Sequence, residues 1–121
     1  MSEYTPDKWT IVGDGEVFKI FGSWAGGYLD SDNWRLSSGL KSIEENATDI
    51  NGELLMHNHS GSIYKGHRNN EGVISFYNQG VLDNMIEKYN KIKDDDKPEM
   101  RVYKLAEYLE LKVVDEWQGG R

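Results

Sequence analysis

The residue types best suited to chemistry gather between Glu53 and His67, in the stretch ELLMHNHSGSIYKGH. All three histidines of the chain lie there, and imidazole is a common metal ligand and proton carrier near neutral pH. A Ser60-Gly61 turn between two alternating runs predicts a β-hairpin. The stretch is therefore either a catalytic or metal-binding site, or a hairpin that carries histidines for other reasons.

The expected register of this hairpin separates the histidines. With the turn at 60–61, His57 faces Tyr64 and Leu54 faces His67, so alternation puts His57 and His59 on one face and His67 on the other. Zinc sites need three or four converging ligands, and only two converge here unless a distant carboxylate joins them. The turn also lacks the G-x-S-x-G pattern of a serine nucleophile. We interpret the stretch as a hairpin with two partly exposed histidines.

A second set of candidate residues lies in GSWAGGYLDSDNWRLSSG, residues 22–39. Trp24, Tyr28 and Trp34 offer large ring faces. Arg35 beside them can stack on rings or pair with a phosphate or carboxylate. Such a set suits a nucleotide-like ligand or a hot spot for a protein partner. The alternative is that the tryptophans cap the core and Arg35 pairs with a surface aspartate.

Three more residues complete the candidate ligand-binding set. His57 and Tyr64 share the same predicted face of the hairpin. Arg68 lies in GHRNNEG, a polar loop that leads into a predicted helix, where free backbone N–H groups would attract an anion. The plainer interpretation of this loop is a simple connection between a strand and a helix.

Strands come first among the elements that must position these residues. In KWTIVGDGEVFKIF, the Asp-Gly turn at 14–15 predicts a two-residue hairpin that pairs Ile11 with Phe18 and Trp9 with Ile20. All four side chains then share one face. A further strand is expected from about Asn33, and LKSIEENA continues as a strand or a bulged extension.

Helices follow the strands. A hairpin turn is expected at Asn51-Gly52, and from Val73 apolar residues recur with a helical period. Asp96 before Pro98 predicts a second helix, and LKVVDEW suggests a last strand. The order predicts an α+β fold. We expect a twisted antiparallel β-meander of about five to six strands, which could close into a barrel-like form, followed by one or two α-helices in a single domain spanning residues 1–121.

Composition limits the classes of function. The 121 residues carry a formal net charge of −7, which argues against binding of a nucleic-acid backbone by a broad basic surface. The acidity suits either solubility or a basic protein partner. The chain has no cysteine, no signal-peptide pattern and no apolar run long enough for a membrane span, so a cytoplasmic protein is expected.

The segments YTPDKW, GSWAGGYLDSDNWRLSSG and HNHSGSIYK follow one another in a recognisable order. From about Tyr4 to Tyr64 the chain resembles a set of small uncharacterised proteins encoded by tailed bacteriophages. That resemblance carries no known activity and no catalytic residues. It implies a viral accessory protein in the cytoplasm of an infected host, of the kind that blunts host defence by gripping a host protein or sequestering a signalling nucleotide.

Three functions remain open at this point. The leading one is a non-enzymatic protein that binds a nucleotide-like ligand or a host factor. The second is an acidic inhibitor of a protein–protein interaction, and the third is a small hydrolase that uses His57 or His59. No cofactor, metal or membrane partner is expected, and homo-oligomer formation stays open.

Overall fold

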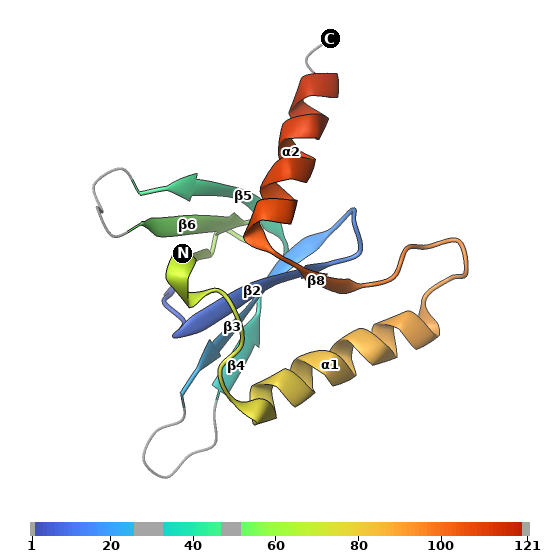
Figure 1. Ribbon diagram of the computed structural model, residues 1–121, viewed down its shortest axis with the longest axis horizontal. Coiled ribbons are helices and arrows are strands. Elements are labelled where there is room, and N and C mark those ends of the chain that lie inside the picture. The colour runs from blue at the N-terminus through green and yellow to red at the C-terminus, as the bar shows by residue number, and fades with distance from the viewer. Residues whose placement is uncertain (1, 26–32, 47–51, 120–121) are drawn as a thin grey trace.

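The computed structural model describes residues 2–25, 33–46 and 52–119, with side chains described as far as residue 112. Figure 1 shows the α+β fold predicted from the sequence, in which most strands precede the first helix and one short strand lies between the two helices. In chain order the elements are β1 (Glu3–Tyr4), β2 (Lys8–Gly13), β3 (Phe18–Trp24), β4 (Asn33–Leu36), β5 (Leu40–Glu45), β6 (Glu53–Asn58), β7 (Ile63–His67), a 3-10 turn (Arg68–Asn70), α1 (Ser75–Ile92), β8 (Arg101–Tyr103) and α2 (Leu105–Gly119).

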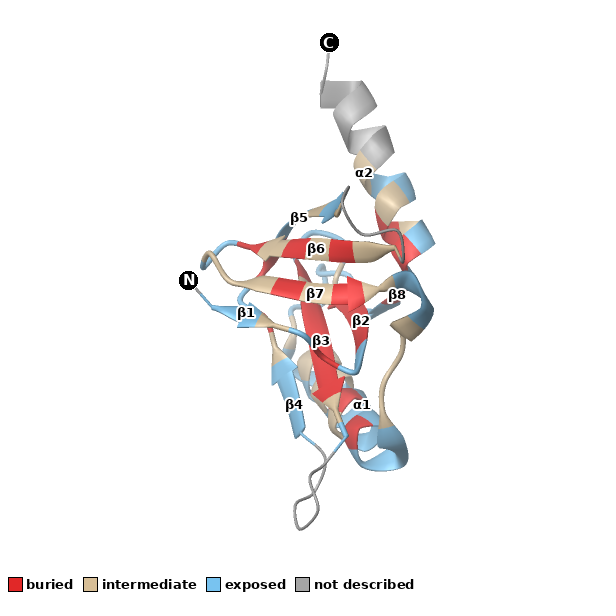
Figure 2. Ribbon diagram, turned by 90° about the vertical axis from the view of Figure 1, so that its left-hand side faces the viewer, coloured by how far each residue is buried: buried red, intermediate tan, exposed pale blue. Residues whose placement is uncertain are grey.

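The strands form two four-stranded sheets that pack face to face. One sheet has the order β1-β7-β6-β5 and the other the order β4-β3-β2-β8. Figure 2 shows β6 and β7 crossing in front of β3, with buried and less buried residues alternating along both strands. The sheets do not close into a barrel. The pairs are antiparallel except for β1 and β7, which run parallel.

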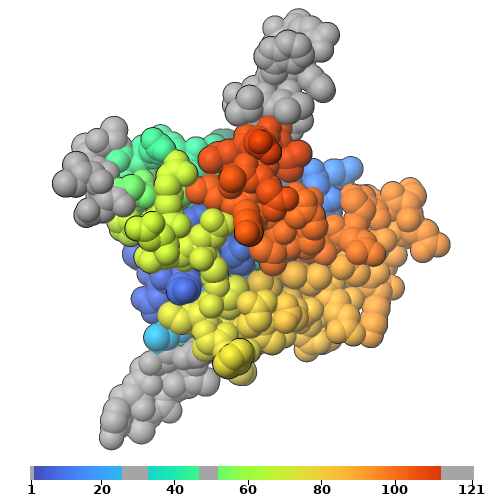
Figure 3. All heavy atoms as spheres, viewed as in Figure 1, coloured from blue at the N-terminus to red at the C-terminus, as the bar shows by residue number. Residues whose placement is uncertain are grey.

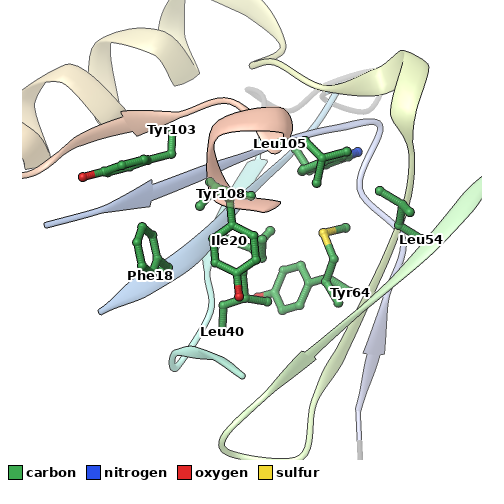
Figure 4. Close-up of a cluster of buried hydrophobic side chains, with 11 residues drawn as sticks. Phe18, Ile20, Leu40, Leu54, Tyr64, Tyr103, Leu105 and Tyr108 are labelled. Atoms are coloured by element: carbon green, nitrogen blue, oxygen red, sulfur yellow. The ribbon is translucent and has the colours of Figure 1, made fainter. Parts of the chain in front are cut away.

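Two apolar clusters hold these layers together. The larger one lies between the sheets and under the first turns of α2, where side chains from all three converge (Figure 4). Its fully buried members include Trp9, Ile11, Ile20, Met56 and Tyr64. The smaller cluster, built on Val12, Phe21 and Leu82, joins the outer face of the second sheet to α1. In Figure 3, α1 and the chain around β8 lie side by side over the strands behind them.

The β2–β3 hairpin has the predicted face but a different register. The four predicted side chains are all buried in the cluster between the sheets. However, Ile11 lies opposite Ile20 and Trp9 opposite Gly22, so the predicted pairing is wrong by two residues. The Asp14 carboxylate accepts hydrogen bonds from the backbone N–H groups two and three residues further on, both at 2.9 Å. This side-chain turn extends the loop to four residues.

The histidine hairpin is displaced by one residue from its predicted register. His57 lies opposite Ile63, and Met56 lies opposite Tyr64. The turn begins at Asn58, whose backbone N–H donates to the Ser62 carbonyl at 3.0 Å and whose side-chain amide donates to the same carbonyl at 3.2 Å. The loop therefore has three residues instead of two.

A one-residue shift exchanges the two faces of a strand. Tyr64 faces the core with Met56, and His57 shares the outer face with His67. The prediction that His67 lies on the opposite face from His57 is therefore wrong. The predicted turn at Asn51-Gly52 lies partly outside the described residues, although β5 and β6 pair antiparallel as it requires.

The C-terminal third departs most from expectation. The first helix is confirmed, but the segment after Pro98 forms strand β8, which pairs with β2. The second helix begins only at Leu105, and it includes the segment predicted as a last strand. Leu105, Tyr108 and Leu109 have helical spacing and pack on the core. Neither described helix combines the length and apolar content that a bilayer span requires.

Candidate functional site

Strand β4 separates two residues that the sequence placed on one surface. Trp34 lies opposite Ser23 and Arg35 opposite Gly22, and neighbouring residues of a strand point to opposite faces. Trp34 stacks on Phe21 with ring centroids 5.6 Å apart, on the side covered by α1. Arg35 points toward the other sheet. The structure does not bring Trp34 and Arg35 into one site, and Tyr28 lies outside the described residues.

Trp24 anchors the chain that precedes β2. Its indole N–H donates to the Thr5 carbonyl at 3.0 Å. The Asp7 carboxylate, on the same segment, accepts from the Ala25 backbone N–H at 2.8 Å. Trp24 therefore holds the N-terminal segment against the end of β3. The geometry supports this structural role for Trp24 instead of the predicted ligand-binding role.

Arg35 instead lies in a pocket at the edge where the two sheets meet. The pocket has a volume of about 510 Å³. Its walls are β1, the residues around the end of β4, and the β6–β7 hairpin. It is lined by Tyr4, Arg35, Leu36, Tyr64 and five serines, namely Ser2, Ser37, Ser38, Ser60 and Ser62. No described aspartate or glutamate lines it, although the whole chain carries a net charge of −7.

The Arg35 guanidinium rests on an aromatic wall. Its central carbon lies 4.3 Å from the centroid of the Tyr4 ring, and the Tyr4 and Tyr64 rings lie 5.0 Å apart. Within the described residues Arg35 forms no ion pair, whereas Arg68 and Arg101 each pair with a glutamate. A guanidinium that is positioned by stacking but not neutralised can donate two parallel hydrogen bonds to a carboxylate or phosphate.

Tyr64 forms the floor of the pocket and is only 1% exposed. Burial raises the pKa of its hydroxyl, while the charge of Arg35 and a hydrogen bond with it act in the opposite direction. The net pKa is raised, so the phenol stays neutral at physiological pH. A neutral phenol can donate a hydrogen bond to an anion and does not repel it.

A chain of serine hydroxyls forms the opposite wall. The Ser38 hydroxyl donates to the Ser60 hydroxyl at 2.9 Å, and the Ser60 and Ser62 hydroxyls lie 3.1 Å apart. The Ser60 backbone N–H also donates to the Ser38 hydroxyl at 3.3 Å. Hydroxyl groups can rotate to donate or accept. These hydroxyl groups can therefore turn toward ligand oxygens without movement of the backbone.

Most residues that line the Arg35 pocket, namely Tyr4 and the serines, were not predicted as site residues from the sequence. Tyr4 enters the pocket because β1 pairs in parallel with β7, with Tyr4 directly opposite Tyr64. No local pattern predicts such a pairing across sixty residues. The serines had a weaker signal, since Ser-Ser-Gly follows β4 and Ser-Gly-Ser forms the hairpin turn. Only the Ser-Gly-Ser motif was interpreted, as a hairpin turn, and the structure shows that Ser38 of the other motif lies against it.

His57 lies away from this pocket, on the outer face of the first sheet. Its Nε2 atom lies 2.7 Å from Oε1 of Glu44 on the neighbouring strand, and its side chain is 30% exposed. The pair borders a separate hollow of about 430 Å³ with Lys41 and Ser42. Across the described ranges, no group of three or more His, Asp or Glu side chains is placed to hold a metal ion.

Arg68 is also remote from Arg35. It lies in the 3-10 turn after β7, and its Nη2 atom forms an ion pair with Oε1 of Glu45 on β5. Helix α1 begins only at Ser75, so Arg68 does not lie at the N-terminus of the predicted α-helix, contrary to expectation. Of the six candidate residues that the structure describes, only Arg35 and Tyr64 lie together in one pocket.

The chain matches no protein-family model, and no curated protein and no solved structure is significantly similar to it.

Proposed function

We propose that the protein binds a small phosphorylated, nucleotide-like ligand in the Arg35 pocket and does not transform it. The observation that carries this proposal is the Arg35 guanidinium, which is stacked on Tyr4 and has no carboxylate partner in the described chain. A volume of about 510 Å³ lies within the range of small-molecule sites. In a protein of net charge −7, a pocket whose described lining contains Arg35 and no carboxylate favours a negatively charged ligand.

Each wall of the pocket has a role in this proposal. Arg35 pairs with the phosphate through two N–H groups, and the hydroxyls of Ser38, Ser60 and Ser62 donate to the remaining phosphate oxygens. The ring edge of Tyr4 and the side chain of Leu36 provide an apolar wall for a base or another ring. The ligand is bound through charge at one end and through apolar contact at the other.

Binding without turnover is the simplest role for this set of side chains. No histidine or carboxylate lines the pocket among the described residues, so its serines have no adjacent general base. The resemblance to tailed-phage proteins adds a biological setting, in which the protein sequesters a host signalling nucleotide in the cytoplasm of an infected cell. This setting rests on the resemblance alone.

Binding of a host protein is the second candidate, because an aromatic surface is exposed at the start of α1. Phe76 is 97% exposed and Tyr77 is 56% exposed. The Asn78 amide donates to the Asn33 carbonyl at 3.2 Å, which places this turn beside β4 and the 40% exposed Trp34. Exposed aromatic side chains are frequent hot spots in protein interfaces. A basic partner would also suit the acidic chain.

Calorimetric titration against inorganic phosphate and a panel of linear and cyclic nucleotides tests the leading proposal. Arg35→Ala should weaken binding by about ten- to a hundredfold, the cost of a charge-assisted hydrogen bond. Arg35→Lys should restore only part of the affinity, because an ammonium lacks the planar fork. Arg101→Ala is the matched control, since Arg101 also lies over a tyrosine ring, 3.7 Å from the Tyr103 centroid, but outside the pocket.

Two results would refute the ligand proposal. One is the absence of binding by any member of the panel. The other is a melting temperature many degrees lower for Arg35→Ala than for Arg101→Ala, which would make Arg35 a structural residue. If a host protein binds instead, steep weakening with rising ionic strength would identify a charged interface.

A further inference from the structure

Another hollow lies on the face of the second sheet that α1 covers, between the turn of the β2–β3 hairpin and the C-terminal half of α1. It has a volume of about 340 Å³, and its lining is mainly apolar. Val12 and Val17 contribute from the hairpin, Met85 from α1, and Met100 from the segment before β8. Lys19 and Tyr89 bring polar groups to its border. Leu36 borders both this hollow and the Arg35 pocket, but the proposed function uses none of the other residues that line the hollow.

The packing of α1 explains why this space is open. Leu82, near the middle of the helix, is fully buried against Phe21 and Val12, but Met85 further along is only partly buried. Beyond Met85, the Tyr89 hydroxyl donates to the Asp14 carboxylate at 2.8 Å. The C-terminal half of α1 is therefore held by a polar contact at the hairpin turn, and the apolar surface beneath it is not filled.

The lining is suited to an apolar guest. Methionine side chains are flexible and polarisable, so Met85 and Met100 can adapt to the shape of a ligand. Val17 is 54% exposed, and a molecule seated in the hollow would cover it. Removal of this apolar surface from water would drive binding.

The charged side chains around the hollow indicate which polar group a bound ligand should carry. Lys19 lies opposite Val12 in the β2–β3 register and so shares the face that α1 covers. Its ammonium group takes part in no ion pair with another described residue. The Asp14 carboxylate also lines the hollow, but it already accepts two backbone N–H groups and the Tyr89 hydroxyl. These donors are neutral, so Asp14 keeps its negative charge, but its oxygens are already engaged at the turn. The charged group of the hollow that no other described residue engages is the Lys19 ammonium.

We propose that this hollow binds a small amphipathic carboxylate, with its apolar body between the hairpin and α1 and its carboxylate on Lys19. A medium-chain fatty acid has this chemistry, and decanoate is a suitable probe. The methionines provide the readout. Met85 and Met100 line the hollow, whereas Met56 is fully buried between the sheets. In protein with ¹³C-labelled methionine methyl groups, decanoate should shift the Met85 and Met100 signals and leave that of Met56 in place.

The head group is tested with an uncharged analogue. Decanoate should bind about tenfold more tightly than decanol, the worth of a charge-assisted hydrogen bond. Lys19→Met should remove this difference, whereas Lys41→Met, which deletes the same charge from the other sheet, should preserve it. Arg35→Ala should leave decanoate binding unchanged.

Four outcomes would overturn the proposal. They are no shift at Met85 and Met100 with decanoate, an equal shift at Met56, equal affinities for decanoate and decanol, and loss of decanoate binding in Arg35→Ala. The last outcome would place the carboxylate in the Arg35 pocket. Nucleotide binding should depend on Arg35, and decanoate binding should depend on Lys19. Each titration therefore tests one proposal independently of the other.

Discussion

Gly66 lies where β7 passes against the central tryptophan of the core. A Cβ atom at this position would lie 2.5 Å from Cδ1 and 2.6 Å from Nε1 of Trp9, and 3.0 Å from Cε of Met56. Trp9 is fully buried, and its indole N–H donates to the His67 carbonyl at 2.9 Å. We therefore expect Gly66→Ala to displace the indole ring of Trp9.

The cost of Gly66→Ala has two parts. Overpacking a filled core costs about 1–3 kcal/mol, because neighbouring side chains and backbone must shift. Displacement of the ring also lengthens the bond from its N–H to the His67 carbonyl, and an unsatisfied buried donor costs about 1–3 kcal/mol. We expect the free energy of unfolding to fall by about 2–6 kcal/mol, which is a large part of the stability of a small domain.

Urea unfolding followed by tryptophan fluorescence measures this change. Gly80→Ala is the matched control, since a Cβ atom at this exposed position of α1 would meet no other atom within 4 Å. That control should raise the free energy of unfolding by about 0.5–1 kcal/mol, because alanine favours the helix. Surface substitutions usually change the free energy of unfolding by less than about 0.5 kcal/mol. If Gly66→Ala changes it by no more than this, the close packing of β7 on Trp9 is refuted.

The remaining predictions concern the hairpins. Phe18→Ala should cost about 3–5 kcal/mol in thermal or urea melts, because the ring is 5% exposed and packs edge-on against two tyrosines; an unchanged melt would contradict this packing. Asp14→Ala should cost about 1 kcal/mol at pH 7 through the lost turn hydrogen bonds, after allowance for solvent screening. Burial would raise the pKa of Asp14, but bonds from two backbone N–H groups and from Tyr89 lower it below 3.8. The carboxylate thus stabilises the fold above pH 3.8 and loses this effect as the pH falls through the lowered pKa, so urea melts of parent and Asp14→Ala should converge at acidic pH; a constant difference would exclude the carboxylate as its source. His57→Ala should cost less than about 1 kcal/mol, because its partner Glu44 is exposed, and it should leave nucleotide titrations unchanged; loss of nucleotide binding in this variant would implicate the outer face.

Local patterns predicted which residues within one strand share a face, but not which residues of neighbouring strands pair. Alternation alone places Trp9 and Ile11 on one buried face. The register, in contrast, depends on hydrogen bonds from the side chains of Asp14 and Asn58, which lengthen each turn beyond the two residues expected from Gly placement. No local sequence pattern predicted strand β8. A segment of three residues is too short to show alternation, and it forms a strand here because it pairs with β2.

The candidate site was predicted in part, for similar reasons. Arg35 was identified from its residue type and neighbours, and the structure places it in a pocket. Its proposed partner Trp34 is adjacent in sequence, and the alternation of strand residues already implies that the two point apart. Tyr4 reaches Arg35 through a pairing between distant segments, which one sequence cannot reveal.

The pairing of β8 with β2 also sets an order of folding events. The β2–β3 and β6–β7 hairpins close short loops, which form rapidly. Completion of the second sheet brings Tyr103 to Ile11, across most of the chain, and such a contact is slow because the entropy of closing a long loop must be lost first. During synthesis the edge of β2 from Ile11 to Gly13 stays open until β8 has emerged. In pulse-labelling hydrogen exchange, amides shared by β2 and β3 should therefore gain protection before those shared by β2 and β8.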